Sequence, residues 1–226
     1  HGTKNTLDLA VHHKAKFLHF STSAVYGEPV DEKPFREDYW GSINPIGPRS
    51  AYNEGKRFAE SLVVNYRERY EIDAKIVRVF NTYGPKMRLD DGRMIPDFIR
   101  AALNNEPINI YGDESSVSTF CYISDMVTGL IQVMKSTLQG PVNLGHPDVV
   151  PIQDIAKKVV DKLDSTSHLA FQDHLPHTSR QGVPDIAQAR NKLGWYPMTD
   201  LDLGLDKTIE FMRAHSRLYG IHQATK

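Results

Sequence analysis

The sequence predicts an α/β fold built on a parallel sheet, and three observations support that prediction. Short apolar runs alternate with longer segments of helical periodicity, which is the pattern of strands joined by helices. Two of these runs, "AKFLHFSTS" and "DAKIVRVFNTYG", end in small polar residues, as buried strands do at the carboxyl edge of a sheet. The composition, 40% hydrophobic and 24% charged over 226 residues, allows a buried core in one domain or in a domain with a small lobe.

The first part of the chain alternates helix and strand around one long loop. The expected elements are a helix at 3–12, a strand at 15–23, a helix from Ser50 to about Tyr70 and a strand at 73–84. Four prolines and two glycines make residues 28–49 a loop. The second helix carries apolar side chains at helical spacing, at Ala51, Phe58, Ala59, Leu62 and Val63.

The second part has shorter strands and ends in a mixed tail. The expected elements are a helix at 94–104, strands at 108–112 and 119–124, a helix from Asp125 to Met134, a strand at 141–145 and a terminal helix near 203–215. Ligands of parallel sheets bind beyond the carboxyl ends of the strands. The polar ends of the first two strands and the helix that begins at Ser50 can therefore converge on one site.

Charge and cysteine content narrow the classes of partner. A formal net charge of −1 gives no overall field for nucleic acid or for an anionic membrane, so we expect a small-molecule partner. The single cysteine, Cys121, excludes an internal disulfide and a cysteine-based metal site and fits a reducing compartment. The ten histidines lack ligand-spaced partners, so no metal site is expected. No apolar run approaches the roughly 20 residues that span a bilayer, so we expect a cytoplasmic protein.

The segment "SAYNEGKRFAE" at 50–60 places Tyr52 and Lys56 four residues apart on a predicted helix. Side chains at this spacing share one helix face, with Cβ atoms about 5 to 6 Å apart. A free phenol has a pKa near 10, so a tyrosine that acts as a base at neutral pH needs a neighbouring positive charge that favours the phenolate. The pair can therefore serve hydroxyl oxidation. Taken alone, the pair is more often a chance pair on an exposed turn, because such pairs are common, so the surrounding motifs decide between the two interpretations.

Further stretches carry a family resemblance. They are "STSAVYGEP" at 21–29, "YNEGK" at 52–56, "VRVFNTYGPKMRLDDGR" at 77–93 and "FCYISDMVTGL" at 120–130. Together they resemble the extended short-chain dehydrogenase/reductases that act on nucleotide sugars. Within that group, "YWGSINPIGPRSAYNEGKRFAE", "DDGRMIPDFI" and "PDIAQARNKLGWYP" are most similar to the UDP-glucuronate decarboxylases, which make UDP-xylose. The resemblance runs from His1 to about Met212.

The resemblance implies an incomplete Rossmann-type parallel sheet, with its amino-terminal half missing, and a small mixed carboxyl-terminal substrate lobe. It assigns residues 1–84 to the carboxyl-terminal part of the NAD-binding domain. Residues 85–226 fall mainly in a nucleotide-sugar-binding lobe with interleaved Rossmann elements. The implied cofactor is NAD, the implied substrate is a UDP sugar, and the implied assembly is a homodimer paired through the helices at 3–12 and 50–68.

The resemblance also implies roles at the reacting centre. Tyr52 would take the proton of the sugar's 4-hydroxyl group while hydride passes to NAD, Lys56 would hold the nicotinamide ribose, and Thr22 would hydrogen-bond the same hydroxyl. Phe80 and Thr82 join Tyr52 and Lys56 as implied cofactor contacts. A ketone at C4 makes the C5 carboxylate a β-keto acid, so carbon dioxide can leave. Protonation at C5 and return of the hydride then complete a redox-neutral cycle.

Four residues are implied on the substrate side. Asn81 would hydrogen-bond the sugar nucleotide, Arg93 would meet its diphosphate, and Tyr111 would line the uridine pocket. Arg180 is a displaced candidate for an arginine that the family carries just before "PD". The plainer alternatives are a turn-forming Asn81, a solvated Arg93 and a Tyr111 that belongs to the core.

The sequence departs from the family pattern at four places. It contains no G-x-G-x-x-G loop for a dinucleotide pyrophosphate. Ala24 stands where the decarboxylases carry glutamate, Ser118 and Thr119 stand where they carry Thr-Arg, and Gly182 replaces the arginine before "PD". A dehydratase is disfavoured, because that branch carries Asp-Glu where this chain has Ser23 and Ala24.

Two alternatives to a decarboxylase stay open. A UDP-sugar 4-epimerase needs only the tyrosine, lysine and hydroxyl set, and epimerases often carry small residues near this strand end. A non-catalytic or truncated relative would keep the fold for subunit association alone, which the missing cofactor loop favours.

Overall fold

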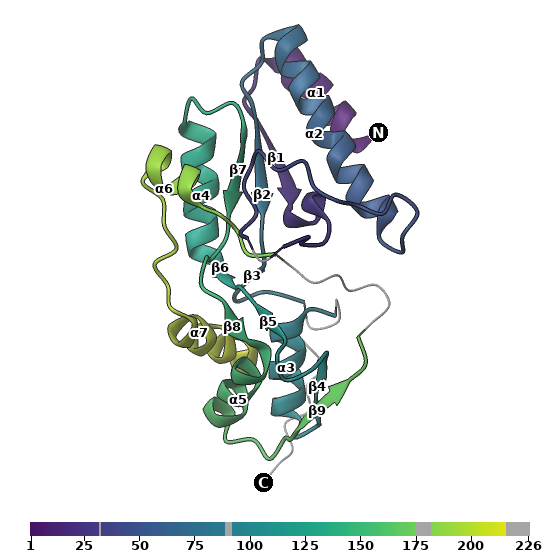
Figure 1. The fold of residues 1–226 in the computed structure, drawn as a ribbon. Helices are drawn as coiled ribbons and strands as arrows, with labels where there is room; N and C mark the ends of the chain where they lie inside the picture. The colour runs from purple at the N-terminus through teal and green to yellow at the C-terminus, as the bar shows by residue number, and fades with distance from the viewer. Residues whose placement is uncertain (32, 89–91, 175–181, 216–226) are drawn as a thin grey trace. The chain divides into compact units, whose positions relative to one another are not determined.

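The computed structural model describes residues 1–31, 33–88, 92–174 and 182–215. The chain divides into two compact units (Figure 1). Within the described residues, the first unit is drawn from His1–Asn81, Ser124–Pro147 and Pro176–Pro197, and the second from Thr82–Ile123, Asp148–Leu175 and Met198–Lys226. Each unit is therefore assembled from separate stretches of the chain. The roles expected for residues 1–84 and 85–226, as cofactor and substrate parts, stay predictions.

The first unit is built on a three-stranded parallel sheet. Its strands are β1 (Phe17–Thr22), β2 (Ala74–Val79) and β7 (Pro141–Leu144), in the order β1-β2-β7. The register pairs Ser21 with Arg78 and Arg78 with Asn143, so these three polar residues form one row across the sheet. The predicted α/β fold with a parallel sheet is confirmed.

Helices cover both faces of this sheet, as a parallel sheet requires. They are α1 (Gly2–His13), α2 (Ser50–Tyr70), α4 (Ile123–Lys135) and α6 (Ala187–Leu193). A short 3₁₀ turn, η1 (Ser23–Tyr26), follows β1. Figure 1 shows α1 and α2 on one side and α4 and α6 on the other. On the first side, Leu7 of α1 and Val63 of α2 pack on Ile76 of β2. On the other side, a side chain at Gly129 of α4 would approach Leu144 within 2.8 Å, so α4 lies directly on β7.

The long loop after η1 is held close to the carboxyl end of β1. Gly27 bridges to Ser42 and has a φ of 74°, which favours glycine. A Cβ atom at Gly27 would also lie 1.8 Å from the carbonyl oxygen of Ser42. The described residues between Gly27 and Arg49 contain neither a helix nor a paired strand, as their prolines and glycines predict.

The second unit combines three helices with three two-stranded pairings. Its elements are β3 (Thr82–Tyr83) with β6 (Cys121–Tyr122), β4 (Ile108–Tyr111) with β9 (Leu169–Gln172), β5 (Val117–Ser118) with β8 (Val150–Pro151), and α3 (Met94–Leu103), α5 (Ile152–Leu163) and α7 (Leu201–Ala214). The first two pairings are parallel and the third is antiparallel, so the unit is mixed as expected. Its core joins Ile99 of α3, Ile155 of α5 and Ile209 of α7. The side chain of Asp200 caps α7 by accepting from the amide of Leu203.

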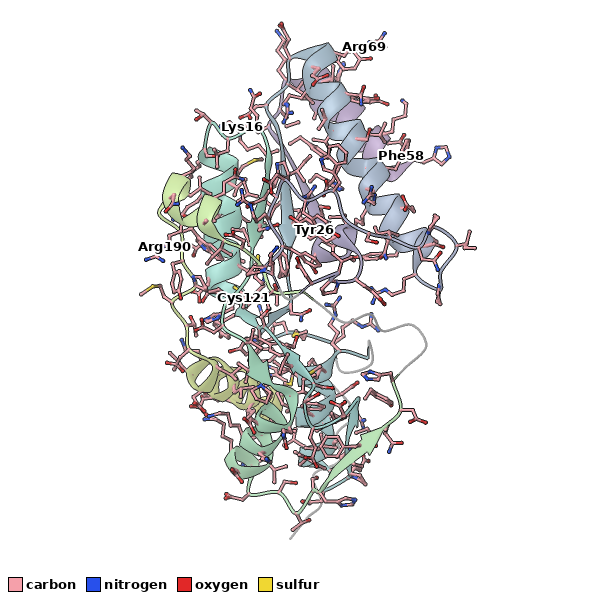
Figure 2. All side chains as sticks on the ribbon, viewed as in Figure 1. Lys16, Tyr26, Phe58, Arg69, Cys121 and Arg190 are labelled. Atoms are coloured by element: carbon pink, nitrogen blue, oxygen red, sulfur yellow. The ribbon has the colours of Figure 1, made fainter. Side chains whose placement is uncertain are left out.

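Some predicted boundaries are wrong. The strand expected at 119–124 shortens to Cys121–Tyr122, because α4 begins at Ile123, two residues before the predicted start. The two short elements β9 and α6 were not predicted, since neither is long enough to show a clear period. In α2, Ala59 and Val63 are buried as expected, but Ala51 and Phe58 are exposed. Figure 2 shows Phe58 on the outer side of α2.

Among the described residues, no helix has the length and apolar character that crossing a bilayer demands.

Candidate active site at the carboxyl end of the first sheet

The structure ties the Tyr52 and Lys56 face of α2 to the end of β1. The ammonium Nζ of Lys56 donates to the carbonyl oxygen of Phe20 over 2.7 Å. One turn further along α2, the carboxylate of Glu60 accepts from the hydroxyl of Ser21 over 2.5 Å. Neighbouring residues of the strand thus contact neighbouring turns of the helix. These two contacts form a seam between α2 and β1; Tyr52 lies in the first turn of α2, and Thr22 ends β1.

The phenol of Tyr52 is open to a ligand. Its side chain is 45% exposed, so the ring is not turned into the protein interior. The guanidinium of Arg49 lies over the ring, 5.5 Å from its centroid, and supports it from the preceding turn. Tyr52 and Lys56 are therefore an accessible phenol and an ammonium on one helix, and Lys56 has a fixed partner in β1.

The hydroxyl oxygen of Thr22 accepts a hydrogen bond within the protein. Its Oγ1 accepts a hydrogen bond from the amide of Ala24 over 3.2 Å, which caps the 3₁₀ turn η1. A hydroxyl that accepts in this way keeps its own proton for donation. Thr22 is half-buried, so this proton can be offered at the sheet edge.

A buried ion pair lies beneath these residues. Arg78 of β2 donates to the carboxylate of Glu60 in a bidentate manner, through Nε over 3.0 Å and through Nη2 over 2.8 Å. Both side chains are nearly buried, at 12% and 13% exposure. Burial opposes the charge of Arg78, but the hydrogen bonds and the charge of Glu60 outweigh it and raise the pKa of Arg78. The guanidinium of Arg78 is therefore held charged beneath the sheet edge.

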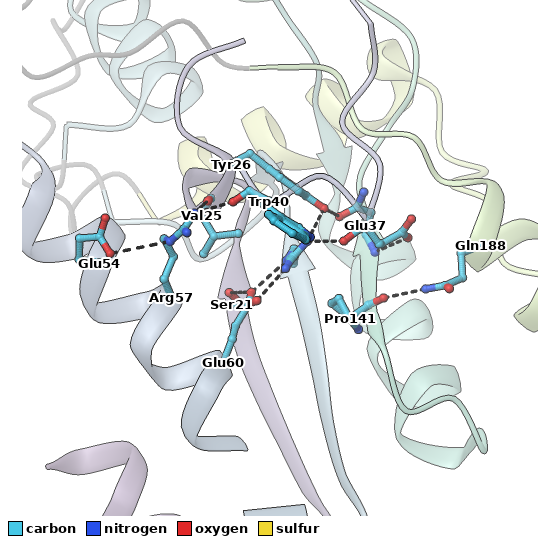
Figure 3. Close-up of polar contacts among 12 residues, drawn as sticks. Ser21, Val25, Tyr26, Glu37, Trp40, Glu54, Arg57, Glu60, Pro141 and Gln188 are labelled. Atoms are coloured by element: carbon cyan, nitrogen blue, oxygen red, sulfur yellow. Dashed lines mark hydrogen bonds and ion pairs between the residues drawn. The ribbon is translucent and has the colours of Figure 1, made fainter. Parts of the chain in front are cut away.

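Tyr26 extends this polar cluster from β2 to β7. Its hydroxyl accepts from Nη1 of Arg78 over 2.9 Å and donates to Oδ1 of Asn143 over 2.7 Å. Burial raises the pKa of Tyr26 to about 12, so this phenol stays protonated and is no candidate base. Burial likewise raises the pKa of Glu37, whose Oε1 accepts from the amide of Asn143 over 3.0 Å. Figure 3 shows Glu60 directed from α2 toward Ser21, and Tyr26 beside Glu37.

Arg57 anchors the long loop to the same helix. Its Nη1 donates to the carbonyl oxygen of Trp40 over 2.6 Å and to that of Val25 over 3.2 Å. Glu54, one turn before it, lies 3.8 Å from its Nε (Figure 3). The loop, η1 and α2 are thereby joined around the candidate site.

No sequence motif predicts a site role for Glu60, Arg78 or Tyr26. One signal could have found them: an arginine interrupts the apolar strand "AKIVRV", and buried arginines need a partner. Glu60 also follows Lys56 at the same spacing at which Lys56 follows Tyr52.

His19 is a buried titratable group beside this seam. It is 8% exposed, and no protein atom of the described residues bonds its Nε2. Burial, with the charge of Lys56 as a second cause, lowers the pKa of His19. His19 is therefore neutral near pH 7. In the described part of the chain, no three His, Cys, Asp or Glu side chains cluster so as to hold a metal ion.

The remaining predicted site residues fall in different surroundings. The ring of Phe80 is buried in an aromatic cluster with Tyr26 and Phe35, so its side chain is committed to the core. Asn81 is half-buried just after β2. Tyr111 of β4 is 44% exposed, which excludes the core alternative. Arg180 lies outside the described residues.

Thr82 and Arg93 line one pocket of the second unit. The pocket has a volume of about 290 Å³ and is also lined by Lys86 and Ile123. Two cationic side chains, Lys86 and Arg93, thus border a cavity that follows the strand β3.

The structure also shows the contacts and burial of the positions that depart from the family pattern. Ala24 lies in η1, where its amide donates to Thr22 and its carbonyl oxygen accepts from the amide of Gly27, while its methyl side chain has no polar atom. Ser118 and Thr119 are buried. Gly182 packs on the ring of Phe35 so closely that a Cβ atom would lie 2.2 Å from that ring. An arginine at position 182 is therefore incompatible with this packing.

Comparisons with known proteins show which family and which solved folds the chain resembles. The model of the NAD dependent epimerase/dehydratase family matches residues 1–145. UDP-glucuronic acid decarboxylase 2 of Arabidopsis thaliana is 41% identical over 219 residues, which cover 97% of this chain and 48% of that protein. UDP-glucuronic acid decarboxylase 1 of Danio rerio is 41% identical over 210 residues, 93% of this chain and 50% of that protein. The chain thus spans about half the length of these curated relatives.

Two solved structures are similar in fold. UDP-glucose 4-epimerase of Thermotoga maritima, solved with UDP-glucose, superposes with a TM-score of 0.87 at 23% identity, covering 95% of this chain and 69% of that one. UDP-glucuronic acid 4-epimerase of Bacillus cereus, solved with UDP-glucuronic acid and NAD, gives a TM-score of 0.81 at 28% identity, covering 94% and 66%. With the parallel sheet and the match over residues 1–145, the chain belongs to the NAD dependent epimerase/dehydratase family.

Proposed function

We propose that the protein oxidises C4 of a UDP-linked sugar with NAD and carries the reaction on through the 4-keto sugar. One observation carries this proposal: Lys56 is tied to β1 through the carbonyl oxygen of Phe20, while Tyr52, on the same face of α2, stays open at the carboxyl end of a parallel sheet. Ligands of such sheets bind at that end. Family membership supports the same chemistry.

In this proposal, Tyr52 is the base and its Oη receives the proton of the 4-hydroxyl group. The ammonium of Lys56 places a positive charge four residues away on the same helix. The Thr22 proton is available for a hydrogen bond to the same sugar oxygen, because its Oγ1 already serves as an acceptor for Ala24. These groups act as a positioned acid–base set, which typically contributes 10²–10⁴-fold to rate.

The residues of the first unit fit NAD on the nicotinamide side. When bound, NAD would supply a hydride acceptor for C4. Lys56 would hold its ribose, Tyr52 would lie beside it, and any contribution of Phe80 would come from its backbone, since its ring is in the core. Phe20, on the other face of β1 from Ser21, is 52% exposed, and β1 is an edge strand among the described residues. We propose that further chain pairs with β1 and completes the cofactor site.

Decarboxylation of UDP-glucuronate to UDP-xylose is the proposed overall reaction. A 4-ketone lies β to the C5 carboxylate, so the electrons of the broken C–C bond pass into the carbonyl as carbon dioxide leaves. A proton then adds at C5, and return of the hydride to C4 with a proton on its oxygen restores the 4-hydroxyl. The similarity to decarboxylases from a plant and a fish, at 41% identity, supports this reaction over others in the family.

A 4-epimerase is the second candidate, and Ala24 favours it. The position that carries glutamate in the resembled decarboxylases here has no side chain able to bond or move a proton. The Bacillus cereus UDP-glucuronic acid 4-epimerase is 28% identical over 94% of this chain. In that reaction the carboxylate is retained and only the configuration at C4 changes.

The pocket of the second unit is the proposed anion site. Lys86 and Arg93 border it, and two cations beside a cavity of about 290 Å³ suit the diphosphate of a sugar nucleotide. Tyr111 of β4 keeps its proposed place against the uracil, as its exposure allows. Asn81 and Arg180 remain proposed substrate contacts by resemblance.

A homodimer in the cytoplasm completes the proposal. Leu9 of α1 and Phe58 of α2 are 57% and 65% exposed on helices that pack together through Leu7 and Val63. Exposed apolar side chains on adjacent helices suit a helix-to-helix contact with a second copy. The sole cysteine, Cys121, is a buried free thiol, which agrees with a reducing compartment.

The test is product analysis with UDP-glucuronate and NAD. Release of carbon dioxide with a UDP-pentose supports the decarboxylase, whereas a UDP-uronate of inverted C4 identifies the epimerase. Titration calorimetry with NAD separates both from a non-catalytic relative. Absence of product from UDP-glucuronate, UDP-glucose and UDP-galactose, together with absence of NAD binding, would refute the proposal.

A further inference from the structure

We propose that Glu60 is a positioning residue of the active site: it fixes α2 against the carboxyl ends of β1 and β2 and so holds Tyr52 and Lys56 beside Thr22. This inference rests on the proposed roles of those three residues. Glu60 itself touches no reacting atom, and its effect passes through the helix that carries the proposed base.

The contacts of Glu60 come from two neighbouring strands. Oε1 accepts from the hydroxyl of Ser21 over 2.5 Å and from Nε of Arg78 over 3.0 Å, and Oε2 accepts from Nη2 of Arg78 over 2.8 Å. Ser21 and Arg78 are register partners on β1 and β2. A single carboxylate thus bridges two strands at one level of the sheet, directly before the strand ends.

Together with Lys56, this bridge sets the register of the helix. Lys56 contacts Phe20 and Glu60 contacts Ser21, so two points one turn apart on α2 meet two consecutive residues of β1. Sliding α2 by one turn moves it about 5.4 Å and breaks both contacts. Without Glu60, the carboxylate bridge from α2 to β1 and β2 is lost, and among the described residues Lys56 provides the remaining side-chain hydrogen bond from α2 to β1.

Stability alone is a poor explanation for this arrangement. Replacing a buried ion pair by apolar residues is often neutral or stabilising, so such a pair is weak evidence of a stabilising role. A fork of hydrogen bonds to a bidentate arginine fixes direction and distance more sharply than apolar packing does. The same Arg78 is held in turn by the hydroxyl of Tyr26 and by the carbonyl oxygen of Glu37, over 2.9 and 3.0 Å. Arg78 is therefore a fixed reference point for the helix.

The test compares Glu60→Gln with the matched control Lys75→Gln. Glutamine keeps the length of Glu60 and loses its charge. Lys75 lies on the same strand as Arg78, near the opposite end of β2, where its buried ammonium pairs with Asp73 over 2.6 Å. Both variants remove one charge of a pair anchored in β2. Only Glu60→Gln removes a charge at the end of the sheet that bears Thr22.

Three readouts are measured on the folded protein. The first is the pair kcat and KM for the UDP sugar that it turns over, and the second is the acid limb of the pH–rate profile. The third is the rate at which Lys56 is acylated, measured by peptide mass spectrometry. For Glu60→Gln we expect a kcat lower by roughly 10- to 100-fold with KM changed by less than about threefold. We also expect an acid limb at higher pH and severalfold faster acylation of Lys56. Lys75→Gln should leave all three readouts near their original values after correction for the folded fraction.

Unchanged kcat, acid limb and acylation in folded Glu60→Gln would overturn the inference. If that variant does not fold, Ser21→Ala removes one of the three bonds to Glu60 and should shift the same readouts in the same directions by less. A failure of the proposed function has a different signature. The unaltered protein would then turn over no UDP sugar, while acylation of Lys56 in the variants still decides whether Glu60 holds the helix.

Discussion

The ammonium of Lys56 donates a hydrogen bond to the carbonyl oxygen of Phe20 over 2.7 Å, and this contact joins the helix of the proposed base to the strand of the proposed hydroxyl donor. Phe20 lies two residues before Thr22, and Lys56 lies one helical turn after Tyr52. The contact between Phe20 and Lys56, which are 36 positions apart in the sequence, thus connects the two elements that carry Thr22 and Tyr52.

Lys56→Met should lower turnover by about 10²- to 10⁴-fold, because the change removes the positive charge that favours the phenolate of Tyr52. The free energy of unfolding should change by only about 1 kcal/mol, the usual worth of one hydrogen bond. Steady-state kinetics and urea titration measure the two effects. Lys16→Met, which alters an exposed lysine paired with Asp73, is the control. Turnover of Lys56→Met at the unaltered rate would contradict the assigned role.

Arg78→Gln should lower the free energy of unfolding by about 3–5 kcal/mol, because it leaves the buried carboxylate of Glu60 without its partner. The matched surface change, Arg36→Gln, breaks a pair with Asp38 whose side chains are 68% and 72% exposed. That change should cost less than about 1 kcal/mol. Urea titration at neutral pH compares them, and equal losses would show that the Arg78–Glu60 pair is not truly buried.

Tyr26→Phe should reveal a pH dependence above pH 10. The folded pKa of Tyr26 is raised to about 12 by burial, so its contribution to stability is complete below the unfolded value near 10 and is lost as pH rises toward 12. At pH 8 the variant should be less stable by about 1–3 kcal/mol, because Arg78 and Asn143 lose a buried hydrogen-bond partner. This gap should narrow between pH 10 and 12. A gap that stays constant would show that Tyr26 ionises freely.

Gly182→Ala should destabilise the first unit by about 1–3 kcal/mol, because the added methyl group must displace the ring of Phe35. Gly194→Ala is a useful comparison, since a Cβ there meets nothing within 4 Å although φ is 66°. Thermal unfolding measures both. If Gly182→Ala costs nothing, the Phe35 ring is loosely packed, and the conflict between this packing and an arginine at 182 disappears.

The fold could be predicted because its strands and long helices are strongly periodic. The existence of β1 and β2, and the helix from Ser50 to Tyr70, follow from the pattern of apolar and polar residues, although β2 ends at Val79, before the predicted end at residue 84. Phe58 shares the helical spacing of Ala59 and Leu62 but is exposed, because spacing marks an apolar face without showing what covers it. The helix α6 escaped prediction since seven residues give too little periodic signal.

The site could be predicted only where its reactive side chains lie close together in the sequence. Tyr52 and Lys56 lie on one helix, so four residues of separation suffice to pair them. The bridge from Glu60 to Ser21 and Arg78 joins residues 39 and 18 positions away across two strands. It depends on the register of β1 with β2, which no local pattern encodes. Long-range polar contacts of this kind needed the structure.

The most direct measurement of the central claim is turnover of UDP-glucuronate, with NAD, by the protein and by Tyr52→Phe. Phenylalanine keeps the ring under Arg49 and removes only the hydroxyl, so folding should be nearly unchanged. The account predicts conversion by the unaltered protein and a loss of about 10²- to 10⁴-fold in the variant. Equal rates for the two proteins, at equal folded fraction, would contradict it.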